Sequence, residues 1–345
     1  MKIGVRKVGP LGHLYDDKYD SRFFESLWKN HLLLKLSPDD EVVWFDRMPV
    51  EPEGFDFALG DLEAVIGAWI FDNMITDEML SKHPNLKYIG TISHGYSEFD
   101  KIACRNHGVT VTNTHFNDYA VAQHTMALLL EITNNIGINS EYYKDLKWED
   151  SGMANNKLFT RQTELQNKTF GIIGLGSIGL LVAKMAAGFG MKVMSYSKHY
   201  KGGNEYSFIR QVELNTLLQS SDIISLHCSS NKDTQKIINE RSIKLMKDGV
   251  ILLNCARGDL IDEEAVYNAL NWGGGARDSG KIYSCGIDVL EGEPLKEPSK
   301  LLKHPRVLAT EHIAWATPES RIRSVTVACE NFFNWRAGCP TSVIL

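Results

Sequence analysis

A glycine-rich turn at residues 174–179 constrains the fold of this chain more than any other feature. It follows the apolar run FGIIGL and leads directly into LLVAKMAAGFG, a run with the composition of a buried helix. Its glycines are Gly174, Gly176 and Gly179. Between a strand and a helix, this spacing allows a tight turn, a close approach of backbone N–H groups to a diphosphate, and close helix–strand packing. The positive end of the helix dipole favours the same anion. The turn therefore predicts a dinucleotide-binding unit.

Short apolar runs alternate with amphipathic segments along nearly the whole chain, which is typical of βαβ units and parallel sheets. A chain of 345 residues has room for about two domains, and the fold class is α/β with a Rossmann-type doubly wound parallel sheet. A long, mostly apolar helix is expected over 120–138 and a final helix over 318–336. The glycine-rich stretch 272–280 is interpreted as a flexible insertion. Strands are expected at KIGV, EVVWF, AVIGAWI, LKYIGTI and VTVTN, then at FGIIGL, MKVMSYS, DIISLHC, GVILLNC, YSCGIDVL and RVLAT.

Charge and cysteine content argue against several classes of protein. The net charge of −6 provides no general attraction to nucleic acid or to an anionic membrane, so neither is an expected partner. No apolar run approaches the roughly 20 residues that a membrane span needs. The six cysteines show no CxxC spacing and the N-terminus resembles a strand rather than a signal peptide, which favours a cytoplasmic protein with reduced thiols. Metal-ligand spacings are absent from the sequence, so no metal is expected.

Three polar residues follow predicted strands of the second series, where ligands of open α/β sheets bind. Arg257 follows GVILLNC, Glu293 lies shortly after GIDVL, and His312 follows RVLAT. A guanidinium can bind a substrate carboxylate and polarise a neighbouring keto oxygen. An imidazole can exchange the proton as hydride moves, and a carboxylate can fix its tautomer and favour its protonated form. The trio therefore indicates carbonyl–carbinol redox chemistry on an anionic substrate.

Several segments of the sequence, taken together, resemble the D-isomer-specific 2-hydroxyacid dehydrogenases. The resemblance rests on AVAQHTMALLLEI, GIIGLGSIG, SSDIISLHC, NCARGDLIDEEAV, GIDVLEGEP and HIAWATPESR, with the glycerate dehydrogenase/hydroxypyruvate reductase branch the most similar. It implies that the Arg, Glu and His are catalytic, and that the substrate is a small 2-keto or 2-hydroxy acid such as hydroxypyruvate or glyoxylate. It also implies a homodimer, a cofactor domain over 118–317, and a smaller flavodoxin-like α/β substrate domain made of 1–117 plus 318–345.

The same resemblance assigns further site residues. Ser177 and Ile178 would contact the pyrophosphate through their backbone. Cys255, Ala256 and Asp288 would lie on the nicotinamide side. The loop Ser93, His94 and Gly95 would hold the substrate carboxylate through backbone N–H groups. This sequence departs from the family in that loop, which usually carries two glycines, and in Ser97, which replaces an aspartate. The insertion near 272–280 lengthens the Arg257-to-Glu293 spacing to 36 residues. None of these departures removes a catalytic group.

The segment after MKVMSYS bears on the choice of cofactor. The dinucleotide fingerprint places an acid about 20 residues after its glycines, where it accepts hydrogen bonds from the adenosine ribose. Here Ser197 stands 18 residues after Gly179, and Lys198, His199 and Lys201 follow. Without the carboxylate a 2′-phosphate is not repelled, and the cations can donate charge-assisted bonds to it. The segment predicts NADP(H) in preference to NAD(H); the alternative is a solvated turn with NAD bound.

Other interpretations remain open at the level of sequence. The chain could be a cofactor-sensing binding protein similar to corepressors of this fold, or a relative of formate or phosphonate dehydrogenases. We interpret His124 as a packing residue, His227 as a structural or cofactor-adjacent hydrogen-bonding residue, and His304 as a surface residue. Cys255 is interpreted as a small buried filler rather than a nucleophile. Asp262 is interpreted as the cap of the helix EEAVYNAL.

Overall fold

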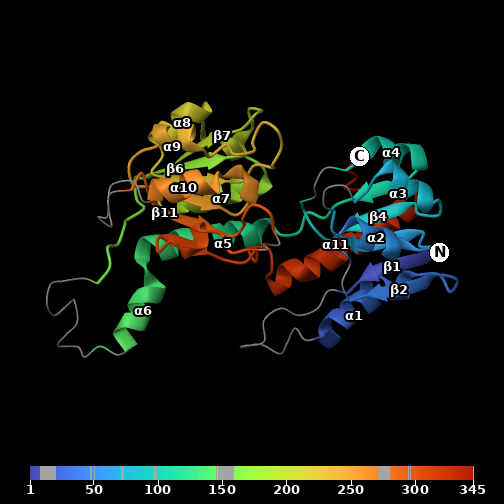
Figure 1. Cartoon of the computed structure of the whole chain (residues 1–345). Helices are drawn as coiled ribbons and strands as arrows, with labels where there is room; N and C mark the ends of the chain where they lie inside the picture. Colours follow the sequence, from blue (N-terminus) through green and yellow to red (C-terminus); the bar gives the residue numbers. More distant parts are fainter. Residues whose placement is uncertain are drawn as a thin grey trace. The chain divides into compact units, whose positions relative to one another are not determined.

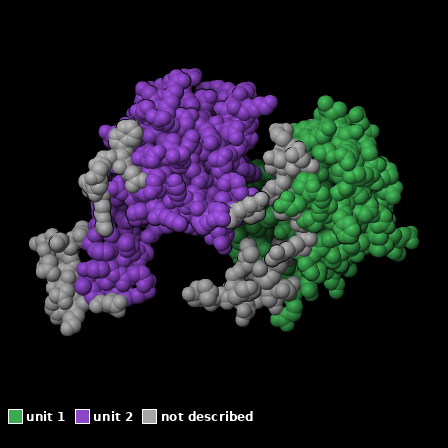
Figure 2. All heavy atoms as spheres, viewed as in Figure 1, with its two compact units in different colours: residues 1–117, 315–345 green, residues 118–314 purple. Residues whose placement is uncertain are grey.

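The chain forms two compact units in its computed structural model (Figure 2). Unit 1 comprises Met1–Asn117 with Trp315–Leu345, and unit 2 comprises Asp118–Ala314. Residues 272–279 of the predicted insertion, and Ser97, lie outside the described residues. The structure describes residues 1–7, 21–46, 49, 51–70, 74–95, 99–144, 146, 159–270, 280–293, 295 and 297–344.

Unit 2 is built on a seven-stranded sheet with parallel pairing throughout, in the order β12-β11-β10-β9-β6-β7-β8. Figure 1 labels β6, β7 and β11 of this sheet. The order reverses at β6, which pairs with β7 on one side and with β9 on the other. This topology confirms the predicted Rossmann-type doubly wound sheet. The two-residue strand β8 was not foreseen. The strands are β6 (Thr169–Ile173), β7 (Lys192–Tyr196), β8 (Arg210–Gln211), β9 (Ile223–Leu226), β10 (Val250–Asn254), β11 (Ile282–Ile287) and β12 (Val307–Ala309).

The long helix expected over 120–138 is divided in the structure. Helix α5 ends at Asn134, and α6 begins after Asn135, whose φ of 54° is left-handed. The side-chain amide of Asn135 donates to the carbonyl of Arg161 at 2.9 Å, and the N–H of Gly137 donates to the Glu131 carboxylate at 3.0 Å. These bonds, one of them to a distant segment of the chain, favour a turn over helix continuation. The helices of unit 2 are α5 (Asp118–Asn134), α6 (Ile136–Lys144), α7 (Ser177–Gly188), α8 (Leu214–Ser220), α9 (Glu240–Leu245) and α10 (Glu263–Leu270), with short 3-10 helices at Asn204–Tyr206, Gly258–Leu260 and Leu301–Lys303.

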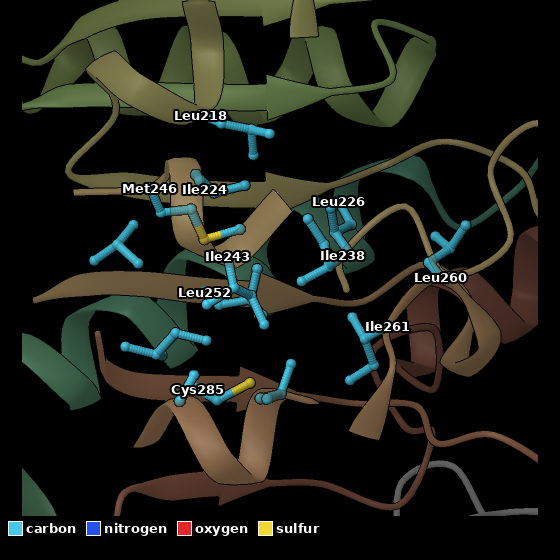
Figure 3. Packing of buried hydrophobic residues seen from close by; sticks show 14 of the residues in the cluster. Leu218, Ile224, Leu226, Ile238, Ile243, Met246, Leu252, Leu260, Ile261 and Cys285 are labelled. Atoms are coloured by element: carbon cyan, nitrogen blue, oxygen red, sulfur yellow. The ribbon is translucent and has the colours of Figure 1, made fainter. Parts of the chain in front are cut away.

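One core cluster of unit 2 fills the space between strands β9 to β11 and helices α8 to α10 (Figure 3). Leu218 of α8 and Ile243 of α9 pack in the same cluster as Ile224 and Leu252 of the sheet. Fully burying an aliphatic side chain contributes about 1.5–3 kcal/mol. The cluster therefore fixes the strands whose carboxyl ends carry the candidate site. On the sheet, α5 contacts β10 and β11 as well as α7.

Unit 1 contains a five-stranded parallel sheet in the order β2-β1-β3-β4-β5, the flavodoxin-like order, which confirms the predicted smaller α/β unit. Tyr88 is fully buried and its hydroxyl lies 2.8 Å from that of Thr112. The final helix has the predicted bounds, and Thr317 caps it by accepting the N–H of Ser320. Among helices of the described residues, none is long and apolar enough to cross a membrane. The elements are β1 (Lys2–Arg6), α1 (Ser21–His31), a 3-10 helix (Leu33–Lys35), β2 (Glu41–Phe45), α2 (Pro52–Leu59), β3 (Ala64–Ala68), α3 (Asp77–Lys82), β4 (Tyr88–Thr91), α4 (Lys101–His107), β5 (Thr110–Thr112) and α11 (Pro318–Arg336).

Candidate active site

The three predicted catalytic residues follow three adjacent strands of unit 2. Arg257 follows β10, Glu293 follows β11 and His312 follows β12, and β11 pairs with both of the other strands. Because the strands are parallel, their carboxyl ends lie at one edge of the sheet. The structure joins two of the residues directly, since Nδ1 of His312 lies 2.6 Å from Oε2 of Glu293. The guanidinium of Arg257 instead donates to the carbonyl of Ala256 at 2.7 Å.

The carboxylate of Glu293 is held from both sides. Its Oε1 accepts the backbone N–H of Leu290 at 2.7 Å, while Oε2 faces the imidazole of His312. An ionised carboxylate only accepts hydrogen bonds, so Nδ1 of His312 carries the donated proton. The imidazole side chain is 46% exposed, which leaves it accessible to a substrate. Nε2 is therefore the atom through which His312 would exchange a proton.

Arg257 lies in a tightly folded segment. Its carbonyl accepts the side-chain amide of Asn254 at 2.8 Å. A Cβ on the next residue, Gly258, would lie 1.9 Å from the carbonyl carbon of Leu290, so only glycine allows this approach to the loop that holds Glu293. Burial lowers the pKa of Arg257, and the negative charges of Asp259 and Glu293 oppose that shift. A guanidinium stays charged in proteins, so Arg257 remains a cation suited to a carboxylate.

The glycine turn fits a dinucleotide. Gly174 has φ 101°, and a Cβ there would lie 2.4 Å from the backbone N of Cys228. A Cβ on Gly179 would lie 2.3 Å from the carbonyl oxygen of Gly174. A Cβ on Gly176, by contrast, would meet no atom within 4 Å. Gly174 and Gly179 thus make the turn, while Gly176 leaves open space at the N-terminus of α7, where Ser177 begins the helix.

The predicted cofactor-selecting residues lie at the end of β7. Ser197 is partly buried and Lys198 is exposed. Nζ of Lys198 lies 2.8 Å from Oδ2 of Asp233, a partner that the sequence did not suggest. The hydrogen bond to Asp233 raises the pKa of Lys198. Both side chains are exposed, by 73% and 67%, so the pair contributes little to stability and can exchange partners.

The structure places the predicted nicotinamide-side residues at the ends of β10 and β11. Cys255 is buried, and burial raises the pKa of its thiol to about 12, which agrees with a filler rather than a nucleophile. Ala256 is partly buried, and its N–H donates to the side chain of Asn254 at 3.0 Å. Asp288 is 1% exposed, and its carboxylate accepts the backbone N–H groups of Ile313 and Ala314 at 2.9 Å. Asp288 therefore binds the loop that carries His312, a contact that the sequence did not indicate.

The predicted substrate loop belongs to unit 1, where it follows β4. The hydroxyl of Ser93 donates to the carbonyl of Gly95 at 2.8 Å, and the side-chain amide of Asn113 donates to the carbonyl of His94 at 2.7 Å. The rings of His94 and His115 meet edge to face with centroids 4.2 Å apart. The loop backbone is thus held by hydrogen bonds, and the loop keeps Gly95 while its His94 packs against His115 from the segment after β5.

Roles were also predicted from sequence for His227, Asp262 and His304. The structure agrees with the first two predictions and differs from the third. Burial lowers the pKa of His227 to about 4, and its Nε2 lies 2.8 Å from the hydroxyl of Ser225, which agrees with a structural role. Asp262 caps α10 by accepting the N–H of Ala265, as predicted. The prediction that His304 is a surface residue is wrong. It is 9% exposed and packs edge to face against Tyr267, because the turn before β12 folds back over α10.

Comparison with known proteins decides the family. Residues 126–314 match the model of the D-isomer specific 2-hydroxyacid dehydrogenase, NAD binding domain. The chain belongs to the D-isomer-specific 2-hydroxyacid dehydrogenase family. It is therefore an oxidoreductase that acts on the CH–OH group and uses a nicotinamide cofactor, which confirms the predicted enzyme class.

Individual relatives of this dehydrogenase support the predicted branch. A hydroxypyruvate reductase of Blautia hydrogenotrophica is 37% identical over 271 residues, which cover 77% of this chain and 81% of the relative. A hydroxypyruvate reductase of Thermotoga maritima is 37% identical over 262 residues, 75% of this chain and 80% of the relative. Among solved structures, an acyclic imino acid reductase in complex with NADPH and D-Arg is 30% identical with a TM-score of 0.79, over 100% of both chains.

Among the described residues of this dehydrogenase, no group of three His, Cys, Asp or Glu side chains could hold a metal ion.

Proposed function

We propose that this dehydrogenase reduces a small 2-keto acid, hydroxypyruvate or glyoxylate, to the D-2-hydroxy acid with NADPH. The observation that carries the proposal is the 2.6 Å contact between His312 and Glu293. Arg257 follows a strand of the same sheet and lies at the same edge. Relatives named hydroxypyruvate reductase and glyoxylate reductase support the choice of substrate. In this proposal residues 118–317 bind the cofactor, and residues 1–117 with 318–345 bind the substrate.

The mechanism follows from the geometry of the trio. When bound, the cofactor supplies hydride to the C2 carbonyl carbon. Arg257 binds the substrate carboxylate and polarises the keto oxygen beside it. His312 donates its Nε2 proton to that oxygen, and Glu293 stabilises the imidazolium before the transfer because its carboxylate accepts from Nδ1. One hydride and one proton are thus added, and the substrate leaves as the hydroxy acid.

The cofactor would rest on the glycine turn, held by the backbone of Ser177 and Ile178 beside the open space at Gly176. NADP(H) is preferred in this proposal because Ser197 introduces no negative charge at the ribose, and Lys198 is exposed at the same strand end. A phosphate dianion would draw Lys198 from its weak surface pair with Asp233.

The proposal includes a homodimer that uses the exposed apolar surface of α6. None of the residues of α6 is buried within the chain. Its aliphatic residues Ile136 and Ile138 are 62% and 53% exposed, and the ring of Tyr142 stacks on that of Phe159 at 4.0 Å. A second copy would remove these side chains from water. Sedimentation should give twice the mass of one chain, and Ile138→Lys should shift the protein to single chains.

All six cysteines are free, which favours a reducing, cytoplasmic location.

The experiment that tests the proposed function is oxidation of NADPH and NADH against a panel of 2-keto acids of increasing size. The expected result is turnover of hydroxypyruvate or glyoxylate, with a higher kcat/KM for NADPH than for NADH. The variant Ser197→Asp should shift that ratio toward NADH, whereas Asp233→Asn should lower KM for NADPH. A panel without turnover would contradict the proposed reaction, and a wild-type preference for NADH would contradict the proposed cofactor.

A further inference from the structure

The loop that carries His312 is hydrogen-bonded to one buried residue, Asp288, both before and after His312. The N–H of His312 donates to the carbonyl of Asp288 at 2.8 Å. The next two N–H groups, of Ile313 and Ala314, donate to the Asp288 carboxylate at 2.9 Å. Before His312, the hydroxyl of Thr310 lies 2.5 Å from the same carboxylate. The position of the loop therefore depends on the carboxylate of Asp288, which is 1% exposed.

The backbone of His312 needs such restraint. Its φ is 56°, in the left-handed region that costs free energy for a residue with a side chain. Such a conformation persists only where its surroundings hold it. The hydrogen bonds to Asp288 provide that hold for the backbone from which the ring of His312 projects.

A second histidine completes the set of hydrogen bonds from the far side. Nε2 of His124, on α5, lies 2.9 Å from Oγ1 of Thr310 and 3.7 Å from Oδ1 of Asp288. The threonine hydroxyl has one hydrogen, which goes to the carboxylate because the carboxylate can only accept. Thr310 must then accept from His124, so Nε2 of His124 carries a proton. The bonds run in one direction, from His124 through Thr310 to Asp288.

We propose that His124 is a positioning residue of the reaction, which acts through Thr310 and Asp288 to hold the His312 ring in line with the keto oxygen. The inference rests on the proposed role of His312 as proton donor. Helix α5 packs against β10 and β11, so it can fix His124 relative to the strands that carry the site. In this proposal, His124 contributes through the N–H that its ring donates to Thr310.

The test is a matched pair of substitutions in the full-length protein. His124→Leu removes the donor and keeps an apolar side chain on the helix, whereas His124→Gln keeps an N–H in a similar place. We expect His124→Leu to lower kcat about tenfold, the effect of losing one hydrogen bond, with the Kd for NADPH unchanged. The solvent deuterium isotope effect on kcat should rise, because proton transfer is the step that slows. His124→Gln should retain most of the wild-type kcat.

A measurement that needs no turnover also tests whether His124 holds the loop in place. Amide hydrogen exchange across residues 310–314 of the cofactor-free protein should be faster in His124→Leu than in the wild type. If that variant does not fold, Thr310→Val removes the bond from His124 together with the bond to Asp288, and it should lower kcat and speed amide exchange at least as much. Wild-type kcat, isotope effect and amide exchange in His124→Leu would overturn the proposal. So would an equal loss of kcat in both His124 variants with an unchanged isotope effect. The variant His312→Ala separates the two claims: if it turns over normally, the proposed role of His312 as proton donor fails, while amide exchange still decides whether His124 holds the loop.

Discussion

Replacing Gly176 with alanine separates cofactor binding from folding. Gly176 precedes α7 with φ −89° and ψ −163°, an extended backbone that alanine adopts without strain. A methyl group there would meet no protein atom within 4 Å. The fold should therefore be unaffected or stabilised by about 0.4–1 kcal/mol, because alanine restricts the unfolded chain. The same methyl would occupy the space through which a diphosphate approaches the N–H groups of Ser177 and Ile178.

The expected loss of cofactor binding follows from those N–H groups. Losing one hydrogen bond to a charged group costs about 1.5–3 kcal/mol, or roughly a tenfold to hundredfold rise in Kd. Gly188→Ala is the matched control, since it lies at the other end of α7 and its added Cβ also meets nothing within 4 Å. Calorimetric titration with NADPH and thermal unfolding should show a raised Kd only for Gly176→Ala, with melting temperatures at or above wild type for both. A wild-type Kd for Gly176→Ala would refute the assignment of the cofactor to this turn.

Two further predictions concern the supports of the site and stability at acid pH. In Gly258→Ala, the new Cβ would lie 1.9 Å from the backbone of Leu290, so we expect a loss of about 1–3 kcal/mol in urea unfolding together with a lower kcat; an unchanged unfolding midpoint would contradict that approach. The pKa of His227 is about 4 in the folded protein against 6.5 for the unperturbed group, so the unfolded chain binds this proton first as pH falls. The contribution of His227 to stability is fully present above pH 6.5 and is lost progressively towards pH 4, by about 3 kcal/mol in all. Urea unfolding should therefore show the wild type losing about 3 kcal/mol relative to His227→Asn as pH falls through this range; a constant difference would contradict burial of a neutral ring.

The placement of the proposed catalytic trio could be predicted because each member follows its own strand. An apolar run, a break and a polar residue are visible within about ten positions, and a parallel sheet brings the ends of its strands to one edge. Arg257, Glu293 and His312 therefore needed only the assumption of one sheet. The order β10-β11-β12 in the structure meets that assumption.

Contacts between distant segments could not be predicted in this way. His124 and Thr310 are 186 residues apart, and no local period links a helix residue to one particular loop. The pairing of Lys198 with Asp233 spans 35 residues and is equally invisible. The break at Asn135 depends on a bond to the distant carbonyl of Arg161, which outweighs an apolar pattern that continues beyond it. Local pattern sets the elements, whereas tertiary hydrogen bonds set their ends and the fine placement of side chains.

The most direct test of the proposed chemistry is the turnover of His312→Asn with hydroxypyruvate and NADPH. Asparagine keeps a polar side chain of similar reach near Glu293 but cannot donate a proton as an acid. We expect kcat to fall by about 10²–10⁴, the usual contribution of a general acid, while the Kd for NADPH stays at the wild-type value. Turnover within a fewfold of wild type would contradict His312 as the proton donor, and with it the mechanism built on the contact between His312 and Glu293.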